Sequence, residues 1–392
     1  MDTTLNRTWA EINLDALAFN MRSIRNTTKD TAMITAVVKA DAYGHGVCEV
    51  SKVLLENGAD RLAVACLAEA KQLRRAGFDV PILILGATEL FEAEELVNND
   101  IIAACFSYQS AKALSDAAKN LNKTAKIHIK LDTGMSRIGF VAGENDDLAT
   151  KEIKEISKLD NIEIEGIFSH FSTSDEADSS YTMRQLDVFL KFCDRLEAEG
   201  ISIPIRHIAN SAAIISYPET HLDMVRAGIV LYGLYPSDAV DKSKMPLIPV
   251  MSLKSRITMV KEKQAGWGVS YGKDYITEGI TKIATVPVGY ADGYTRNIAK
   301  NGKILLNDGT EAKIIGRICM DQCMIDVTNV NNINAGDEVT LFAAEKITAD
   351  DIAKWSDTIN YEVVCLVSKR IPRVYIEGEK TISARNYIDE LL

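Results

Sequence analysis

The chain has 392 residues, of which 47% are hydrophobic and 25% are charged, and its formal net charge is −11. This length predicts two domains, or one large domain and a smaller one, with enough apolar side chains for a substantial core. The acidic balance argues against nucleic acid or an anionic membrane as a partner, and no apolar run reaches the roughly 18 residues of a membrane helix.

The N-terminal segment, MDTTLNRTWAEINLDAL, lacks the charged and then apolar pattern of a signal peptide. The seven cysteines are scattered and odd in number, which indicates reduced thiols in a cytoplasmic protein and not a disulfide framework. Cys319 and Cys323 form the only close pair. With no histidine or second pair nearby, they predict a structural role and no metal site.

From residue 33 to 228, short apolar runs alternate with helical stretches. A helical face recurs, for example, in GVCEVSKVLLENG. Eight β-then-α units predict a (β/α)8 barrel of the TIM type over residues 13–240. A doubly wound sheet is the alternative, but no GxGxxG follows the first strand. The strand-like runs, most of them apolar on both faces as parallel strands should be, are MITAVVK (33–39), RLAVAC (61–66), PILILG (81–86), IIAACFS (101–107), KIHIKLD (126–132), IEIEGIFSH (162–170), PIRHIAN (204–210) and DMVRAG (223–228).

Beyond about residue 240 the pattern changes. Pro236, Pro246 and Pro249 mark a linker, and strand-like runs such as KIATVPVGYADG and EVTLF then alternate with turn signals. In MSLKSRITMV, the apolar residues from Met251 to Met259 share one face of a strand. We predict a mainly β domain over residues 241–392, joined by an N-terminal strand in residues 1–12. The strand-like run at this end of the chain is RTWAEINL.

Reactive side chains fall at the carboxyl ends of the predicted strands, where the active site of a barrel enzyme lies. Any one of them is more simply explained as a solvated rim residue, and His170 alone as a satisfied core histidine. As a set they are harder to dismiss, because most other strand ends carry small or apolar residues. The set is Lys39, Lys130, Arg137, His170, Asn210, Ser211 and Arg226.

The ends of the last two strands are where barrels commonly bind phosphate. Ser211 opens the helical stretch SAAIIS, so its hydroxyl and the nearby N–H groups could hold an anion, and Gly228 allows close backbone approach. The alternative is an N-cap serine and a turn glycine. Together with Lys39, whose pKa semi-burial would lower, the phosphate site indicates pyridoxal phosphate, a cofactor held as a Schiff base to lysine.

The segment AVVKADAYGHG resembles the cofactor-lysine signature of alanine racemases, pyridoxal-phosphate enzymes built from a barrel and a β domain. Any one such motif could be chance, whereas nine in family order over nearly the whole chain are specific. The other eight are KLDTGMSRIGF, FSHFSTSDE, HIANSAA, MVRAGIVLYG, VSYGKDY, VPVGYADGY, GRICMDQ and INYEVVC.

The resemblance implies a two-base mechanism on a pyridoxal 5'-phosphate aldimine. Lys39 would hold the cofactor and act as one base, and Tyr271 would be the opposite base. Arg226 would face the pyridine nitrogen, and His170 would lie between Arg226 and Tyr271. The rest of the cofactor-binding set would be Tyr43, Asn210, Ser211, Gly228, Ile229 and Tyr361.

The resemblance also implies substrate contacts and a homodimer. Arg137 would hold the substrate carboxylate or brace the cofactor, and Lys130 looks like the lysine that many relatives carbamylate to orient that arginine. Met320 would contact the substrate, with Tyr290 and Asp321 in support. In the family the partner subunit completes each active site, so Tyr271 and Met320 would come from the other chain.

The expected activity is interconversion of L-alanine and D-alanine, which supplies D-alanine for peptidoglycan. A racemase of the same architecture that acts on serine or a broader range of amino acids is the alternative, although Tyr361 and the MDQ loop fit a small pocket. A decarboxylase of basic amino acids shares the fold, but the tyrosine in VSYG argues against it. A non-catalytic cofactor-binding module is usually a single barrel, so the second domain argues against that reading.

Overall fold

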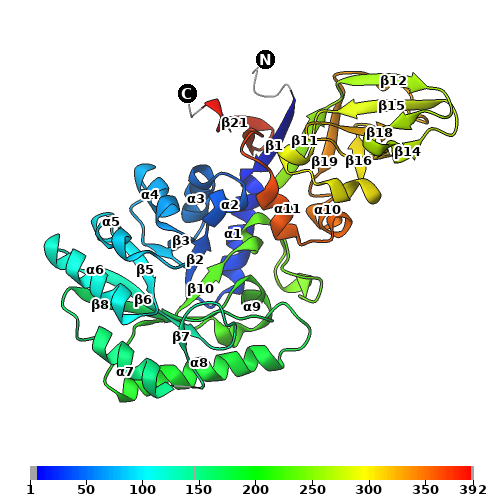
Figure 1. The fold of residues 1–392 in the computed structure, drawn as a ribbon. Helices are drawn as coiled ribbons and strands as arrows, with labels where there is room; N and C mark the ends of the chain where they lie inside the picture. Colours follow the sequence, from blue (N-terminus) through cyan, green and yellow to red (C-terminus); the bar gives the residue numbers. More distant parts are fainter. Residues whose placement is uncertain (1–6, 145, 390–392) are drawn as a thin grey trace. The chain divides into compact units, whose positions relative to one another are not determined.

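The computed structural model describes residues 7–144 and 146–389 (Figure 1). The chain divides into two compact units, which are described separately. The barrel unit holds Ala18–Ala42 and Val47–Leu247, and the β unit holds the residues up to Leu17, Tyr43–Gly46 and the chain from Ile248. The predicted domain boundaries, near residues 12 and 240, stay a prediction. None of the described helices is both long and apolar enough to cross a membrane.

Eight parallel strands form a nearly closed barrel within the described residues, in the order β10-β2-β3-β4-β5-β6-β8-β9, and the short β7 (Phe140–Val141) pairs with β6. Two backbone hydrogen bonds link the chain around β9 to the chain around β10 across the closing gap, from the N–H of Asp223 to the Arg206 carbonyl and from the N–H of Arg226 to the Ala209 carbonyl. The predicted barrel is thus confirmed. Its strands are β2 (Met33–Val37), β3 (Arg61–Val64), β4 (Ile82–Ile84), β5 (Ile101–Cys105), β6 (Ala125–Asp132), β8 (Ile162–Phe168), β9 (Ile205–His207) and β10 (Met224–Ala227).

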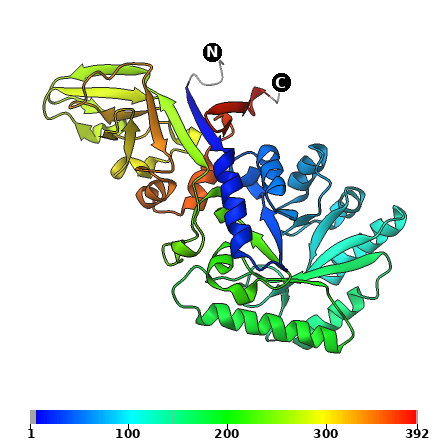
Figure 2. The same ribbon diagram turned by 180° about the vertical axis from the view of Figure 1, so that it is seen from behind.

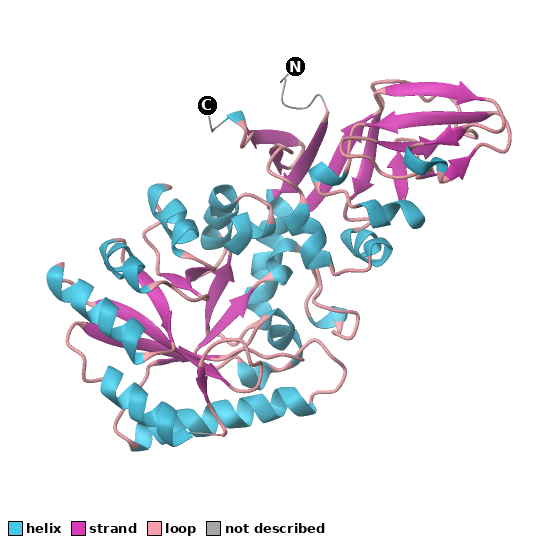
Figure 3. Ribbon diagram, in the orientation of Figure 1, coloured by secondary structure: helices cyan, strands magenta, loops and turns pink. Residues whose placement is uncertain are grey.

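Amphipathic helices cover the barrel strands (Figure 3). In α3, for example, Val47, Val50 and Leu54 are buried, as a period of 3.6 residues requires of one helical face. The helices between Asn13 and Tyr217 are α1 (Leu14–Thr27), α2 (Lys39–Tyr43), α3 (Val47–Glu56), α4 (Leu67–Arg75), α5 (Ala93–Asn98), α6 (Tyr108–Asn120), α7 (Asp146–Ile156), α8 (Ser180–Ala198) and α9 (Ser211–Ser216).

The β unit is built on a seven-stranded sheet, in the order β17-β16-β19-β11-β1-β20-β21. Figure 2 draws the ribbon from behind. The N-terminal strand of the sheet, β1 (Thr8–Asn13), lies between antiparallel β11 (Met251–Arg256) and parallel β20 (Arg373–Glu377). The other strands of this sheet are β16 (Lys303–Leu306), β17 (Glu311–Lys313), β19 (Glu338–Phe342) and β21 (Lys380–Arg385). The predicted mainly β architecture is confirmed.

Over the described part of the β unit, two smaller sheets and two α-helices complete the architecture. A three-stranded sheet contains β12 (Met259–Lys263), β15 (Thr281–Val286) and β18 (Cys323–Asp326), and a hairpin pairs β13 (Gly268–Val269) with β14 (Tyr275–Ile276). The helices are α10 (Ala349–Ser356) and α11 (Asn360–Leu366).

The run MSLKSRITMV is not one strand. It ends as β11 at Arg256 and resumes as β12 at Met259, in a different sheet. Met251, Leu253 and Ile257 are buried as predicted, but Met259 is 52% exposed. The prediction that all the apolar residues share one face is wrong for Met259, because the break after Arg256 interrupts the alternation.

Candidate active site

Lys39 lies on a turn of left-handed backbone and not at the end of a strand. Strand β2 ends at Val37, and Lys39 opens α2, in which Ala40 to Tyr43 have φ between 52° and 56°. Left-handed backbone costs roughly 1–2 kcal/mol for each residue with a Cβ. Side chains hold the turn in place, since Glu69 accepts from the N–H of Ala40 and Asp41 accepts from the N–H of Val47. Strain of this kind is typical of functional sites.

Two cationic side chains, Lys130 on β6 and Arg226 on β10, are buried at the carboxyl ends of their strands. Both lie over the Phe168 ring, at 5.2 and 5.4 Å from its centroid. Within the described residues neither has a carboxylate partner. The Lys130 amine donates to the Leu131 carbonyl, at 2.6 Å. Burial, and next the charge of Arg226, lower the pKa of Lys130 to about 7, so a large share of this amine is neutral at physiological pH.

The Arg226 guanidinium makes four hydrogen bonds, all with neutral acceptors. It donates to Nδ1 of His207 and to Nδ1 of His170, both at 3.0 Å. It also donates to the carbonyls of Ser169 and Ile208, at 2.8 and 3.2 Å. Burial lowers the pKa of Arg226 to about 9, with a smaller contribution from Arg137. The guanidinium therefore keeps its charge at neutral pH while it lies inside the barrel.

The predicted strand-end cations gather around His170, two residues beyond the end of β8. Burial lowers the pKa of His170 well below its ordinary value, and the charges of Arg226, Arg137, Lys130 and Lys39 lower it further. All four charges act on the His170 imidazole because their side chains lie near it. The structure thus brings together five residues that the sequence singled out individually, and it makes the barrel mouth positive.

At the ends of β9 and β10, the alternative reading of Ser211 as a helix N-cap does not hold, and its predicted contact with a phosphate stays a prediction. Asn210 caps α9, because its Oδ1 accepts from the N–H of Ala213 at 3.0 Å. The Ser211 hydroxyl instead accepts from the N–H of Gly228 at 2.9 Å and so ties the ends of the two strands together. Ile229, the next residue, is buried at the start of a 3-10 turn.

In the β unit, Tyr43 and Tyr361 lie together, with ring centroids 6.3 Å apart. Burial raises the pKa of Tyr43 far above its ordinary value, so its hydroxyl is a neutral donor. The neighbouring Gly44 is tightly enclosed, because a Cβ there would lie 2.4 Å from the Val364 carbonyl oxygen. The buried Arg373 donates to the Gly44 carbonyl at 2.9 Å and fixes the chain at this point.

Tyr271 is 71% exposed and stands on a strained turn of the β unit. Ser270 has φ 64° and ψ −173°, a region that is essentially reserved for glycine. The Ser270 hydroxyl donates to the Arg317 carbonyl at 2.6 Å, and Gly272 also has a positive φ of 71°. The turn thus presents the Tyr271 phenol to solvent from a strained backbone.

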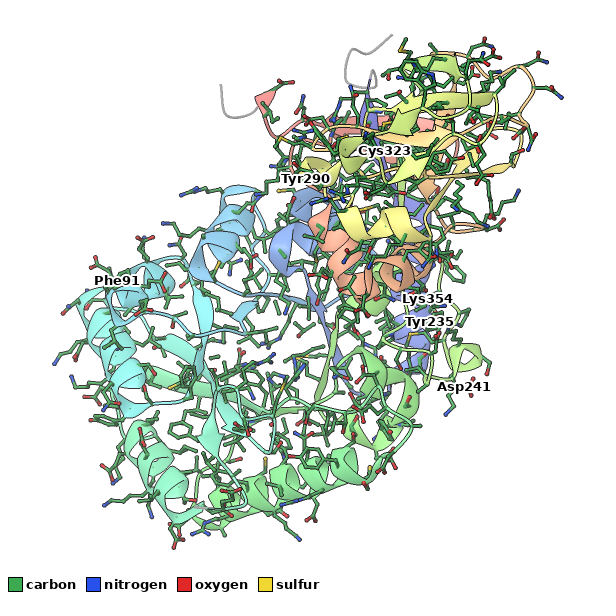
Figure 4. The ribbon with its side chains drawn as sticks, turned by 45° about the vertical axis from the view of Figure 1, so that its right-hand side comes forward. Phe91, Tyr235, Asp241, Tyr290, Cys323 and Lys354 are labelled. Carbon is green, nitrogen blue, oxygen red and sulfur yellow. The ribbon has the colours of Figure 1, made fainter. Side chains whose placement is uncertain are left out.

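Met320, Asp321 and Tyr290 belong to two loops of the β unit that are joined by backbone hydrogen bonds. The N–H of Tyr290 donates to Cys319 and the N–H of Ala291 donates to Met320, at 3.1 and 3.0 Å. Asp321 pairs with Arg370 at 2.6 Å. Figure 4 labels Tyr290 and Cys323 in this unit. Met320 and Tyr290 are both exposed side chains.

Three polar residues of the barrel interior, His128, Glu165 and His207, were missed by the sequence reasoning. They are buried, and a chain of hydrogen bonds connects them to Arg226. The signal that could have found them is a polar residue within an otherwise apolar strand, as in KIHIKLD, IEIEGIF and PIRHI. Among the residues that the structure describes, no three His, Cys, Asp or Glu side chains cluster as metal ligands would.

Comparison with known proteins reveals a similarity over nearly the whole chain. The sequence pattern of the alanine racemase N-terminal domain matches residues 12–236, and that of the alanine racemase C-terminal domain matches residues 250–375. The chain is 52% identical over 388 residues to an alanine racemase of Clostridium tetani, covering 98% of this chain and 99% of that one. It is 51% identical over 383 residues to alanine racemase 1 of Clostridium acetobutylicum, covering 97% and 98%.

The fold is similar to those of solved alanine racemases. The structure from Clostridium difficile 630 superposes with a TM-score of 0.94 at 46% identity, covering 97% of this chain and 99% of that one. The structure from Bacillus anthracis with bound L-Ala-P superposes with a TM-score of 0.91 at 36% identity, covering 98% and 99%.

Proposed function

The chain belongs to the alanine racemase family, and from this premise we propose that it interconverts L-alanine and D-alanine with pyridoxal 5'-phosphate as cofactor. The observation that carries the proposal is the positive barrel mouth. Lys39 stands there on its left-handed turn, and the buried Lys130 and Arg226 have no carboxylate partner in the described residues.

The residues of the mouth fit an anionic cofactor that binds to lysine. A buried cation without a carboxylate partner raises the free energy of a protein that has no ligand bound, and a bound phosphate or carboxylate offsets that cost. When bound, pyridoxal phosphate supplies an electron-withdrawing ring that acidifies the α-carbon of an amino acid. Lys39 would hold this cofactor, Arg226 would face its ring nitrogen, and Asn210 would contact it. Its phosphate would be bound by Tyr43, Ser211, Gly228, Ile229 and Tyr361.

Racemisation needs one base on each face of the α-carbon, because a proton leaves one face and another returns to the opposite face. Lys39 would serve one face. Tyr271 of the partner subunit would serve the other in a homodimer, and its exposure on a strained turn supports this role. The neutral His170 would lie between Arg226 and that tyrosine.

Arg137 would bind the substrate, since its charge acts on His170 at the barrel mouth. Met320 of the partner subunit would also contact the substrate, with Tyr290 and Asp321 in support. Lys130 would be carbamylated, since its pKa of about 7 leaves much of the amine neutral and able to react with carbon dioxide. The D-alanine formed would serve peptidoglycan synthesis.

Incubation of the protein with L-alanine in D2O tests the proposal. The expected result is formation of D-alanine with deuterium at the α-carbon of the product. Parallel incubations with L-serine and L-lysine separate the alternatives. Faster racemisation of serine would reassign the substrate. Release of carbon dioxide from lysine, or no turnover of alanine by the cofactor-loaded protein, would overturn the proposal.

A further inference from the structure

A column of polar side chains runs through the barrel interior, where such barrels usually hold branched apolar residues. It consists of Arg226 on β10, His207 on β9, His128 on β6 and Glu165 on β8. All four are buried, and the two histidines have no exposed surface. The links measure 3.0 Å from Arg226 to His207 and 2.8 Å from His207 to His128. The last, from His128 to Glu165, measures 2.9 Å.

The direction of every hydrogen bond in this column follows from its two ends. Arg226 can only donate, so Nδ1 of His207 accepts and Nε2 of His207 carries the proton. That proton is donated to Nδ1 of His128, which leaves the His128 proton on Nε2, facing Oε2 of Glu165. Burial lowers the pKa of both imidazoles, so each carries a single proton. A carboxylate can only accept, and it therefore completes the one arrangement that satisfies all three links.

The backbone around Glu165 is shaped for this column. In the pairing of β6 with β8, Ile127 lies opposite Ile164 and His128 lies opposite Gly166, so Glu165 is the extra residue of a bulge. A bulge of this kind can re-aim a side chain. A Cβ on Gly166 would lie 2.5 to 2.8 Å from three atoms of the His128 ring. The absent side chain at Gly166 therefore makes the space that the imidazole occupies.

Two cations keep Glu165 in its ionised form. Arg61 donates to Oε2 at 2.5 Å and Lys126 donates to Oε1 at 3.0 Å. Burial alone would raise the pKa of Glu165, but the hydrogen bonds from His128 and Arg61 bring it below its ordinary range. The acceptor end of the column thus stays an acceptor throughout the neutral pH range.

We propose that Glu165 is a positioning residue for the reaction. By fixing the tautomers of His128 and His207, it sets the orientation of the Arg226 guanidinium and directs Nη2 toward His170. Glu165 itself lies three hydrogen bonds away from the mouth and touches no reacting atom. The assignment rests on the proposed racemase function for its catalytic consequence, whereas the tautomers are a property of the protein alone.

The tautomers can be measured directly, because the chain has only five histidines. In the cofactor-loaded protein with ¹⁵N-labelled histidine, long-range ¹H–¹⁵N spectra should show His128 and His207 each with a single proton, on Nε2. In Glu165→Gln the amide NH₂ can face Nε2 of His128, and this permits a reversed column, with both ring protons on Nδ1, in which Arg226 turns away from His207. Both rings should therefore show this second tautomer beside the first. Glu163→Gln is the matched control, since Glu163 is an exposed residue of the same strand, 3.6 Å from Lys126, and should leave the tautomers unchanged.

The kinetic expectation is a split between kcat and KM. Glu165→Gln should lower kcat about tenfold or more and change KM less than about threefold, because a positioning defect acts on the reacting geometry and not on uniform binding. Gly166→Ala should also produce tautomer mixing with the carboxylate still present, since its Cβ would lie 2.5 to 2.8 Å from the His128 ring and force that ring away from Glu165. If Glu165→Gln does not fold, Gly166→Ala therefore tests whether mixed tautomers lower kcat.

Three results would overturn the assignment. One is a proton on Nδ1 of His207 in the unaltered protein. Another is a folded Glu165→Gln variant in which both rings keep a single proton on Nε2. The third is a variant with mixed tautomers whose kcat equals that of the Glu163→Gln control. An unaltered protein with the expected tautomers and no racemisation would count against the proposed function and leave the hydrogen-bond column standing, so the two failures can be told apart.

Discussion

Nη2 of Arg226 lies 3.0 Å from Nδ1 of His170. Because a guanidinium only donates, the imidazole accepts at Nδ1 and carries its proton on Nε2. The low pKa of His170, caused by burial and then by Arg226, prevents a second proton from binding at neutral pH. His170 therefore presents an N–H group without a positive charge. A group of this kind can stabilise a phenolate by hydrogen bonding while the charge stays on Arg226.

Replacement of Lys39 by alanine should reduce racemisation by a factor of roughly 10³ or more, because it removes both the covalent anchor and one base. Borohydride reduction of the loaded protein, followed by peptide mass spectrometry, should attach the cofactor to Lys39. The exposed Lys52 provides the control substitution, Lys52→Ala. Label on another lysine, or full activity of Lys39→Ala, would contradict the assignment.

Tyr271→Phe should impair abstraction of the α-proton from one enantiomer of alanine far more than from the other, by roughly 10²–10⁴ on the affected side. Single-turnover exchange of the α-proton with D2O, started from each enantiomer, measures the two directions separately. Tyr275→Phe is the matched control, because Tyr275 lies in the same hairpin and packs against an apolar cluster. An equal loss in both directions would exclude the two-base assignment.

Stability measurements should reveal the strain at Ser270. Both Ser270→Ala and Ser270→Gly lose the hydrogen bond to Arg317, but only glycine relaxes a backbone with φ 64°. Strain of this type amounts to about 1–3 kcal/mol, and added freedom in the unfolded chain offsets part of it. We expect the glycine variant to unfold at higher urea concentration than the alanine variant. The reverse order would show that the turn is not strained.

Lys130 should make stability depend on pH between about 7 and 10.5. Its pKa is about 7 in the folded protein and ordinarily 10.5, so the unfolded chain binds more protons in this window. The free energy of unfolding therefore rises with pH. Lys130→Met removes the effect and should be more stable than the unaltered protein by roughly 4 kcal/mol near pH 7, with a smaller margin at pH 9.

Urea unfolding in buffer depleted of carbon dioxide measures this margin, since a carbamate on Lys130 would change its charge. The exposed Lys151 supplies the control variant Lys151→Met, whose margin should not change with pH. A Lys130→Met margin that is constant from pH 7 to 9 would show that the amine is not buried as described.

The barrel could be predicted from the sequence because most of its strands are short apolar runs, and such runs are hard to place anywhere except in a covered parallel sheet. The strand ends were less certain. Lys39 and His170 each lie two residues past the last residue of their strands, because the residue pattern does not mark where the ladder of hydrogen bonds stops. The gathering of strand-end cations around His170 follows from topology alone, so it was open to prediction.

Other features depend on tertiary contacts that the local sequence does not encode. No glycine lies between Lys39 and Tyr43 to indicate left-handed backbone. The polar column needs the bulge at Glu165, and a one-residue change of register is invisible in a pattern of alternating residues. The choice of Asn210 over Ser211 as the cap depended on a shift of one position, which sequence reasoning rarely resolves.

The left-handed turn after β2 also sets a rule for grafting this lysine into another barrel. A lysine placed alone at the end of a foreign strand would be followed by residues free to coil in the ordinary right-handed sense. A graft that keeps the handedness has to carry the turn from Lys39 to Tyr43 together with the acceptors that hold it, Asp41 and Glu69. The smallest part of the site that could be transferred is thus the segment from Lys39 to Tyr43 together with the helix that carries Glu69, and the lysine is only its first residue.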